Sequence, residues 1–480
     1  MPNKPFGPQR GMSLQPLTQD LTQRLRSLLG EDSVRSDASS LEAYGRDETE
    51  DLVELPDVVL LPRSPGEVAA VMRLAFDERI AVTPRGAGTG LSGGALPVRG
   101  GILLSLERLD DIREIDMHNL TVVAEAGVIT GDLQRQVESQ GLFYPPDPAS
   151  RSVCQLGGNL AEDSAGPRSC KYGTTRRWVL GLEAILPDGS LIQTGGKNRK
   201  DVTGYNLTQL LVGSEGTLAV ITAATLRLIS RPRSISVLAL PFSSLESGAA
   251  AVSELFRAGL DPATCELMES AAIALVSRID IVPPQLEHAS AFLLLEFHAD
   301  GEDMAVEMAA QAQDIGLRLG GAEGLVAIEP TDRRRLWNVR EKIGEAVRNH
   351  SVYKEADTVV PRDQLAHLVR TARRVGADHG LDVVCYGHAG DGNLHINILR
   401  GSLDEPEWLE RRDQAEDALF QAVVEMGGSI SGEHGIGLTQ RRHLPKALSA
   451  ESIELMKRVK DAFDPHGILN PGKIFPGGTS

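Results

Sequence analysis

The sequence predicts an α+β protein built from two domains, and three observations lead to this expectation. The chain has 480 residues, which exceeds the roughly 100–200 residues of one average domain. Hydrophobic residues make up 41% of the chain and charged residues 24%, a balance that lets each domain bury a core. Short apolar runs alternate with segments of helical periodicity, which indicates mixed sheets and helices.

The first domain is expected over residues 17–232. A helix is predicted to follow Ser64, because Pro65 then occupies its first position and Glu67 its third, the arrangement of a capping box. Apolar periodicity predicts the other elements: a helix at 17–29 ended by Gly30, strands at 56–62, 80–83, 101–106 and 120–124, and a helix from about Thr130.

Arg231-Pro232-Arg233 marks the predicted boundary to a second domain at 233–426, which we expect to be an α+β cap that binds the substrate. A C-terminal segment at 427–480 follows. The N-terminal residues 1–16 are polar and lack the apolar core of a signal peptide, so they are expected to form a loose leader. The clearest elements beyond the boundary are strands at 234–240 and 292–297 and helices at 305–319 and 450–463.

Composition excludes several classes of protein. The formal net charge of -17 disfavours nucleic acid as a partner. No uncharged apolar run approaches the roughly 20 residues of a membrane span. The cysteines lack C-x-x-C spacing, which disfavours disulfides and thiolate metal sites and fits a cytoplasmic protein; they are Cys154, Cys170, Cys265 and Cys385.

Three glycine-rich stretches lie within the first domain, at 84–95, 157–173 and 213–221. Glycines at this density let successive backbone N–H groups turn toward one point, as in loops that bind pyrophosphate. The first stretch formally matches G-x-G-x-x-G, but it leads into another strand rather than into a helix, which excludes a Rossmann NAD site. A long ligand that passes several backbone loops is the better interpretation.

These stretches resemble the FAD-binding domain of the vanillyl-alcohol oxidase superfamily, which implies a two-domain, PCMH-type flavoprotein. The loop at 85–94 contains no His or Cys, so FAD is expected to be bound noncovalently. The resemblance implies that the cofactor-binding residues are Pro84, Arg85, Gly86, Ala87, Gly88, Thr89, Gly90, Leu91, Ser92, Pro146, Asp147, Ser150, Gly157, Gly158, Asn159, Ser164, Ala165, Gly166, Tyr172, Gly173, Glu215, Gly216, Ile221 and Asn470.

A cluster of histidines and one carboxylate lies in the second half of the chain. Residues 394–399 alternate like a strand, which puts His395 and Asn397 on one face. His388 precedes this strand in a glycine-rich turn, and a second such turn carries Glu433-His434. Two histidines and a carboxylate are the ligands expected of a catalytic divalent metal with open positions.

These segments, together with Asn470-Pro471-Gly472-Lys473, resemble the FAD-dependent D-2-hydroxy-acid dehydrogenases, the group of the D-lactate, glycolate and D-2-hydroxyglutarate enzymes. The resemblance implies that His388, His395 and Glu433 bind Zn²⁺ or a similar ion. It also implies that His434 is the base that takes the proton of the substrate 2-hydroxyl. Removal of that proton assists hydride transfer from C2 to flavin N5, and Asn397 is a candidate for binding the carboxylate or the hydroxyl.

The substrate is expected to be a dicarboxylate. Arg340 and Lys354 resemble the Arg and Lys that bind the distal carboxylate in the D-2-hydroxyglutarate branch, but Gly344 replaces a Thr of that branch, so D-malate is also a candidate. The alternatives are a D-lactate or glycolate dehydrogenase, an oxidase that uses O₂, and a non-catalytic flavin subunit of a redox assembly. The expected electron acceptor is external, an electron-transfer flavoprotein or a quinone, and a homodimer is compatible with the sequence.

Overall fold

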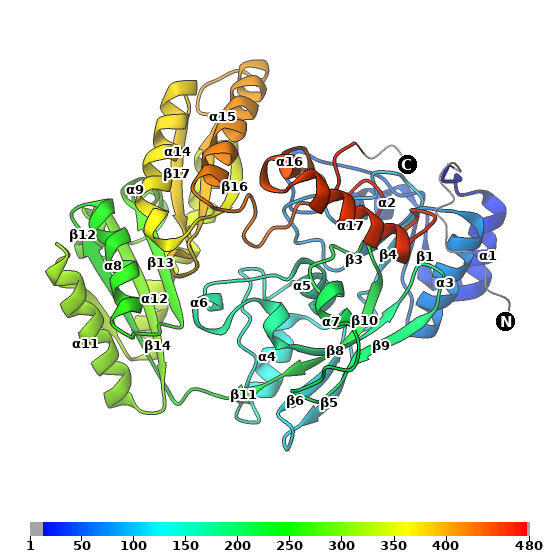
Figure 1. The fold of residues 1–480 in the computed structure, drawn as a ribbon, viewed down its shortest axis with the longest axis horizontal. Coiled ribbons are helices and arrows are strands. Elements are labelled where there is room, and N and C mark those ends of the chain that lie inside the picture. Colours follow the sequence, from blue (N-terminus) through cyan, green and yellow to red (C-terminus); the bar gives the residue numbers. More distant parts are fainter. Residues whose placement is uncertain (1–12, 478–480) are drawn as a thin grey trace. The chain divides into compact units, whose positions relative to one another are not determined.

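The structure is a computed structural model that describes residues 13–477, so most of the predicted leader, residues 1–12, lies outside the described residues. Within that range the chain divides into two compact units (Figure 1). Unit 1 contains residues 13–164, 174–231 and 433–477, and unit 2 contains residues 165–173 and 232–432. Residues 165–173 were expected in the first domain, whereas in the structure they pack with unit 2.

Unit 1 contains two main sheets. In the four-stranded sheet, of order β1-β2-β4-β3, strands β2 and β3 are both parallel to β4, and α3 provides the crossover between them. The five-stranded sheet, of order β5-β6-β10-β8-β9, is antiparallel. A short pair, β7 and β11, completes the unit. The strands are β1 (Val34–Arg35), β2 (Val58–Leu60), β3 (Val82–Arg85), β4 (Ile102–Ser105), β5 (Ile112–Asp116), β6 (Thr121–Glu125), β7 (Leu142–Phe143), β8 (Val179–Ile185), β9 (Leu191–Gly195), β10 (Val220–Arg227) and β11 (Ile229–Ser230).

The C-terminal segment is part of the core of unit 1. Leu469 is fully buried among the apolar side chains of α1, α3 and the four-stranded sheet. The N–H of Val82 in β3 donates to the carbonyl of Ile468, and the N–H of Asn470 donates back to Val82. The helices of unit 1 are α1 (Gln19–Leu29), α2 (Ala38–Tyr44), α3 (Pro65–Glu78), α4 (Thr130–Glu138), α5 (Leu156–Glu162), α7 (Leu207–Leu211), α16 (Leu444–Ala447) and α17 (Ala450–Phe463).

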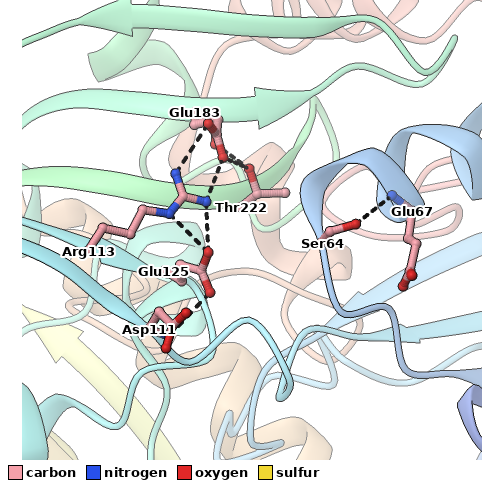
Figure 2. Close-up of polar contacts among 7 residues, drawn as sticks. All are labelled: Ser64, Glu67, Asp111, Arg113, Glu125, Glu183 and Thr222. Carbon is pink, nitrogen blue, oxygen red and sulfur yellow. Dashed lines mark hydrogen bonds and ion pairs between the residues drawn. The ribbon is translucent and has the colours of Figure 1, made fainter.

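The start of α3 confirms the predicted N-cap. The Ser64 hydroxyl accepts a hydrogen bond from the Glu67 N–H at 3.2 Å (Figure 2). Pro65 is the first helical residue. The Glu67 carboxylate accepts from the N–H of Arg63 at 2.6 Å rather than from that of Ser64. The returning half of the capping box is therefore shifted by one residue, and it pairs the N–H of the residue that precedes the N-cap.

Charged side chains connect strands of the five-stranded sheet. Arg113 on β5 lies 2.8 Å from Glu125 on β6 and 3.1 Å from Glu183 on β8 (Figure 2). Thr222 on β10, the strand between β6 and β8, donates its hydroxyl to Glu183. Arg113 thus connects β5 with β8, which are not neighbours in the sheet. Its charge also offsets the repulsion between the carboxylates of Glu125 and Glu183.

Unit 2 is built on one seven-stranded antiparallel sheet of order β15-β12-β14-β13-β17-β18-β16. The expected strands at 234–240, 292–297 and 394–399 form β12, β14 and β18. The strands are β12 (Ser234–Phe242), β13 (Thr264–Glu269), β14 (Ala291–Ala299), β15 (Leu325–Ala327), β16 (Tyr353–Val359), β17 (Asp382–Gly387) and β18 (Asn393–Leu399).

Helices cover both faces of this sheet. Side chains from α9, α12 and α13 share one core with the face that carries Leu294 and Tyr386. On the other face, Gly248 of α8, Gly316 of α11 and Gly376 of α14 allow close approach to strand side chains. The helices of unit 2 are α6 (Ser169–Tyr172), α8 (Leu245–Arg257), α9 (Ser270–Val276), α10 (Pro284–Glu287), α11 (Glu302–Arg318), α12 (Pro330–Glu341), α13 (Ile343–His350), α14 (Leu365–His379) and α15 (Glu405–Glu425). No helix within residues 13–477 is long and apolar enough to cross a bilayer.

Candidate active site

One face of the unit 2 sheet changes from apolar to polar over β13, β17, β18 and β16. Opposed residues of paired strands lie on the same face, so the register identifies its members. His395 is opposite Tyr386 on one side and Asp357 on the other, and Asn397 is opposite Glu355. We call this set the polar face: Glu266, Tyr386, His388, His395, Asn397, Glu355 and Asp357.

Two buried histidines on the polar face direct ring nitrogens toward each other. The Nε2 atoms of His388 and His395 are 3.5 Å apart, and the rings are nearly perpendicular at 82°. Two Zn–N bonds of about 2.0–2.1 Å at a tetrahedral angle separate their nitrogens by about 3.3 Å. The separation of the pair is compatible with two ligands of one metal ion, and the metal itself stays a prediction.

A carboxylate on β13 fixes the orientation of His388. Glu266 is fully buried, and its Oε1 lies 2.6 Å from His388 Nδ1. An imidazole that donates from Nδ1 keeps the lone pair of Nε2 available, the arrangement common around metal-binding histidines. The second oxygen of Glu266 accepts from Arg340 Nε at 2.5 Å, and this guanidinium lies 4.9 Å from the Tyr386 ring centre.

The charges around Glu266 overcome its desolvation. Burial by itself raises the pKa of this carboxyl, but the charges of His388 and Arg340 and their hydrogen bonds outweigh burial and lower the pKa to about 2. Glu266 is therefore ionised at neutral pH. It is a carboxylate that connects the predicted metal ligand His388 with the predicted substrate ligand Arg340.

Asn397 is an amide placed for a ligand. Its side chain is fully buried beside the Tyr386 hydroxyl, and neither Oδ1 nor Nδ2 has a hydrogen-bond partner of good geometry among the described residues. A buried polar group without a partner is costly. Because Asn397 follows His395 by two residues in β18, its amide lies on the same face as the histidine pair, where a substrate can complete its hydrogen bonds.

Lys354 lies on the opposite face of the sheet from the histidine pair. It is opposite Ile398 in the register, whereas Glu355 is opposite Asn397. Successive side chains of a strand alternate between faces, so Lys354 leaves β16 away from the polar face and Glu355 leaves toward it. The structure does not bring Arg340 and Lys354 together, in contrast to the sequence expectation of two cations around one carboxylate.

Glu433 and His434 lie in a bend between two anchored turns. On one side, the N–H of Gly432 donates to the Asp357 carboxylate at 2.7 Å. On the other, the N–H groups of Ile436 and Gly437 donate to the two oxygens of Glu215 at 2.8 and 2.7 Å. The backbone on either side of Glu433-His434 is therefore fixed by buried carboxylates.

The unit 2 sheet carries a second polar network that the sequence did not predict. Glu296 on β14 lies 2.8 Å from His298 Nε2, and His298 Nδ1 lies 2.9 Å from the Tyr172 hydroxyl. The Trp337 indole N–H donates to Glu296 at 2.9 Å, and the Arg168 guanidinium is 3.6 Å away. This network holds residues 165–173 in unit 2. A carboxylate and an imidazole inside an otherwise apolar strand were the signal for it.

We predict that Glu296→Gln destabilises the protein in a pH-dependent way. Burial by itself raises the pKa of Glu296, but the His298 hydrogen bond and the charges of Arg168 and His298 lower it to about 2, below the ordinary 4.5. Its contribution is therefore present above pH 4.5 and is lost as the pH falls toward 2. The variant should lose about 3 kcal/mol at pH 7, and urea unfolding should show this difference shrinking below pH 4.5. A difference that does not vary with pH would contradict the assignment.

The first glycine-rich loop of unit 1 follows β3 and presents bare backbone. A side chain at Gly90 or Gly158 would meet nothing within 4 Å, whereas one at Gly86 would contact the Gly158 backbone at 3.4 Å. The Ser92 hydroxyl is buried without a hydrogen-bond partner among the described residues. An open backbone cradle and a buried polar atom without a partner fit a dinucleotide such as FAD.

Arg85 supports the loop from inside. Its guanidinium donates to the Tyr44 carbonyl at 3.3 Å and lies 5.7 Å from the Tyr44 ring centre. A side chain at Gly88, whose φ of +75° favours glycine, would overlap the same guanidinium. The loop contributes its backbone, and its side chains are half-buried at Pro84 and Thr89 and exposed at Ala87 and Leu91.

The Glu215 turn and Asn470 support this loop from behind. The Asn470 amide donates to the carbonyls of Gly94 and Glu215 at 3.0 and 2.8 Å, and a side chain at Gly216 would lie 2.8 Å from Pro84. Ile221 is buried in β10. Glu215 and Asn470 were predicted to bind the cofactor. In the structure the Glu215 carboxylate and the Asn470 side-chain NH₂ group form hydrogen bonds that connect loops of unit 1.

The remaining predicted cofactor residues are divided between the units. Pro146 and Asp147 are buried in the loop after β7, where the Gln134 amide donates to the Pro146 carbonyl at 2.7 Å, and Ser150 lies in a turn further along this loop. Gly157 and Asn159 lie in α5. Ser164 belongs to unit 1, whereas four residues belong to unit 2: Ala165, Gly166, Tyr172 and Gly173.

Two domain families match this chain. The family described as "FAD binding domain" matches residues 56–195, and the family described as "FAD linked oxidases, C-terminal domain" matches residues 231–474. Among solved structures, 4-ethylphenol oxidase from Gulosibacter chungangensis is similar with a TM-score of 0.77 and 19% identity, covering 95% of this chain and 97% of that one. p-Cresol methylhydroxylase is similar with a TM-score of 0.76 and 16% identity, with the same coverage.

Curated relatives match over nearly the whole length. Identity is 36% to the glycolate oxidase subunit GlcD of Bacillus subtilis, covering 96% of this chain and 97% of that protein. It is 37% to the D-lactate dehydrogenase of Anaerostipes hadrus, covering 87% and 89%. It is 35% to the D-2-hydroxyglutarate dehydrogenase of Stutzerimonas stutzeri, covering 95% and 98%.

The chain therefore belongs to the FAD-linked oxidases, flavoproteins with the two-domain, PCMH-type fold of the vanillyl-alcohol oxidase superfamily. Within that class it is an FAD-dependent oxidoreductase of the D-2-hydroxy-acid dehydrogenase group, which acts on CH–OH donors. The predicted fold class, family and flavin cofactor are confirmed.

Proposed function

We propose that this enzyme oxidises a short D-2-hydroxy acid to the 2-keto acid at a metal-assisted flavin site. The observation that carries the proposal is the histidine pair, His388 and His395, with Nε2 atoms 3.5 Å apart and a buried carboxylate behind one ring. Such a pair is unnecessary for binding FAD, and it is suited to a divalent ion that holds a hydroxy acid.

The proposed metal ligands are His388, His395 and Glu433, with Zn²⁺ as the first candidate ion. Each residue offers one ligand atom. Support for Glu433 comes from the chain itself, because Glu433 directly follows Gly432, whose N–H is held by Asp357, the residue opposite His395. When bound, a divalent ion lowers the pKa of a coordinated hydroxyl.

His434 is the proposed base that accepts the proton of the substrate 2-hydroxyl. It follows the proposed ligand Glu433 directly, and the Glu215 anchor at Ile436 and Gly437 restricts its backbone. Asn397 is proposed to hydrogen-bond the substrate through its buried amide. FAD, expected to be bound noncovalently, supplies the acceptor for the hydride that leaves C2.

The geometry favours a monocarboxylate over the dicarboxylate expected from sequence. That expectation depended on Arg340 and Lys354 acting together, but the register directs Lys354 to the other face of the sheet. Arg340 already contacts Glu266 at 2.5 Å, so its charge is largely matched. Of the alternatives, we therefore propose D-lactate or glycolate before D-2-hydroxyglutarate or D-malate.

The electrons are proposed to leave the flavin to an external acceptor, an electron-transfer flavoprotein or a quinone. No second redox cofactor motif is present in the sequence. Peroxide formation during turnover would indicate an oxidase instead. A role as the flavin subunit of a larger redox assembly is the second candidate, because one relative is named as a glycolate oxidase subunit; activity of the isolated chain with an artificial acceptor would exclude a non-catalytic role.

The test is anaerobic bleaching of the flavin absorbance by D-lactate, glycolate, D-2-hydroxyglutarate, D-malate and the L-enantiomers. We expect rapid bleaching by a D-enantiomer or by glycolate, and loss of that bleaching after chelation with recovery on addition of Zn²⁺. Bleaching that survives complete removal of metal would contradict the metal site. No bleaching by any acid, in protein that contains flavin and metal, would contradict the proposed reaction.

A further inference from the structure

We infer that Glu162 is a positioning residue of the proposed active site: as an uncharged carboxylic acid it packs, together with the carboxylate of Glu215, against Gly435, and the pair holds the backbone that follows His434. The inference rests on the proposed function of His434 and adds the two side chains that keep this base in place. All four residues belong to unit 1.

The two carboxyl groups converge on one glycine. Gly435 has a φ of +76°, and a side chain there would overlap Oε2 of Glu162 and lie 3.1 Å from Oε1 of Glu215. The backbones that carry the two side chains are also joined, because the N–H of Glu215 donates to the carbonyl of Ala161 at 2.8 Å. Both carboxyl groups therefore lie against the residue that directly follows His434.

The two carboxyl groups differ in their hydrogen bonds. Glu215 accepts from the N–H groups of Ile436 and Gly437 at 2.8 and 2.7 Å, and such donors favour an ionised carboxylate. Oε2 of Glu162 is buried and has no hydrogen-bond partner among the described residues. A buried charge without a donor is costly, so Glu162 is the member of the pair that keeps its proton.

The surrounding charges favour the same assignment. Burial raises the pKa of Glu162 well above the ordinary 4.5, and the charges of Glu215 and Asp47 raise it further, whereas the charge of Lys473 lowers it. Burial also raises the pKa of Glu215, but its two N–H bonds and the charge of Lys473 oppose this effect. At neutral pH the pair therefore carries one negative charge and one proton.

The proton on Glu162 matters for His434 because its loss would create repulsion. Two carboxylates would then face each other against Gly435, in an interior where like charges are weakly screened. Residues 433–437 form a bend outside the helices and strands. Displacement of this bend would relieve the repulsion, and it would move His434 with it.

The experiment compares Glu162→Gln with Glu215→Gln, the same uncharged replacement in each member of the pair, in protein loaded with FAD and Zn²⁺. Thermal unfolding is measured over a range of pH. Glutamine imitates the uncharged acid, so Glu162→Gln should unfold about 2–4 °C above the wild type at neutral pH, and this gain should vanish below pH 4.5, where the unfolded wild type is protonated as well. Glu215→Gln should unfold below the wild type, because an N–H donor of the bend loses its acceptor.

Hydrogen exchange tests the positioning role without turnover. The amides of residues 433–437 are followed by mass spectrometry, and wild type and Glu162→Gln are always compared at the same pH. As the pH rises into the alkaline range, the wild-type amides should lose about tenfold in protection relative to those of Glu162→Gln. Stopped-flow reduction of the flavin by substrate should show the same contrast, with an alkaline loss of rate in the wild type that Glu162→Gln lacks.

The outcomes separate this inference from the proposed function. A Glu162→Gln protein that unfolds below the wild-type temperature at neutral pH would show that Glu162 is ionised, and it would overturn the inference. Equal protection of residues 433–437 in both proteins at alkaline pH would also overturn it, because Glu162 would then hold nothing in place. If no hydroxy acid reduces the wild-type flavin, the proposed function fails, whereas unfolding and exchange still decide the charge of Glu162 and its hold on the bend.

Discussion

Replacement of His434 by glutamine should slow the reduction of the flavin by substrate about 10²–10⁴-fold, the usual contribution of a positioned general base. Glutamine keeps a polar side chain of similar reach but cannot accept a proton at neutral pH. The backbone at this position is fixed from both sides, by Asp357 through Gly432 and by Glu215 through Ile436. The loss should therefore reflect the missing base and not a displaced loop.

The rate is measured by stopped-flow reduction of the flavin absorbance under anaerobic conditions, with the FAD and metal content of each protein determined beforehand. The control is His118→Gln, which changes an exposed histidine in the turn between β5 and β6. Its rate should equal that of the wild type. A His434→Gln protein with full cofactor content and more than a third of the wild-type rate would remove His434 from the base role.

Local sequence signals predicted much of the fold. The helix expected at 450–463 is α17 with the same limits, and the cap at Ser64 begins α3 as expected. The alternation over 394–399 placed His395 and Asn397 on one face of β18, which the register confirms. These features depend on periodicity and on the chemistry of nearby residues, so a single sequence contains the information for them.

Features that depend on pairing between distant segments were not predicted. Glu266 contacts His388 across 122 positions of the chain, and no spacing rule connects them. Lys354 was the expected ligand, but the next residue, Glu355, lies on the face of the histidine pair. The face of a strand residue depends on the register with the neighbouring strand, which the sequence does not show. Residues 165–173 looked continuous with the first domain, yet the bond of Tyr172 to His298 holds them in unit 2.

Glu266→Gln should weaken Zn²⁺ binding about 10–100-fold, the range found when an outer partner of a metal-bound histidine is removed. The wild-type carboxylate accepts from His388 Nδ1 and from Arg340 Nε at the same time. A glutamine amide has one oxygen to accept with, and its NH₂ group would face one of these donors. Affinity is measured by titration against a competing chelator, and metal content by elemental analysis, so neither readout depends on turnover.

The matched control for this change is Glu269→Gln, three residues further along β13. Glu269 is also a buried carboxyl group, but it accepts from the Cys385 N–H and pairs with Arg373, away from the histidines. Glu266→Gln leaves the largely buried Arg340 without its carboxylate and should cost about 3–5 kcal/mol of folding free energy. Glu269→Gln releases Arg373, whose side chain is 47% exposed, so its cost should be smaller. Only Glu266→Gln should also lose metal affinity. Equal Zn²⁺ affinity in both variants would mean that Glu266 contributes only to folding. Loss of affinity in Glu266→Gln alone would show that Glu266 orients the metal ligand His388 while it also binds Arg340.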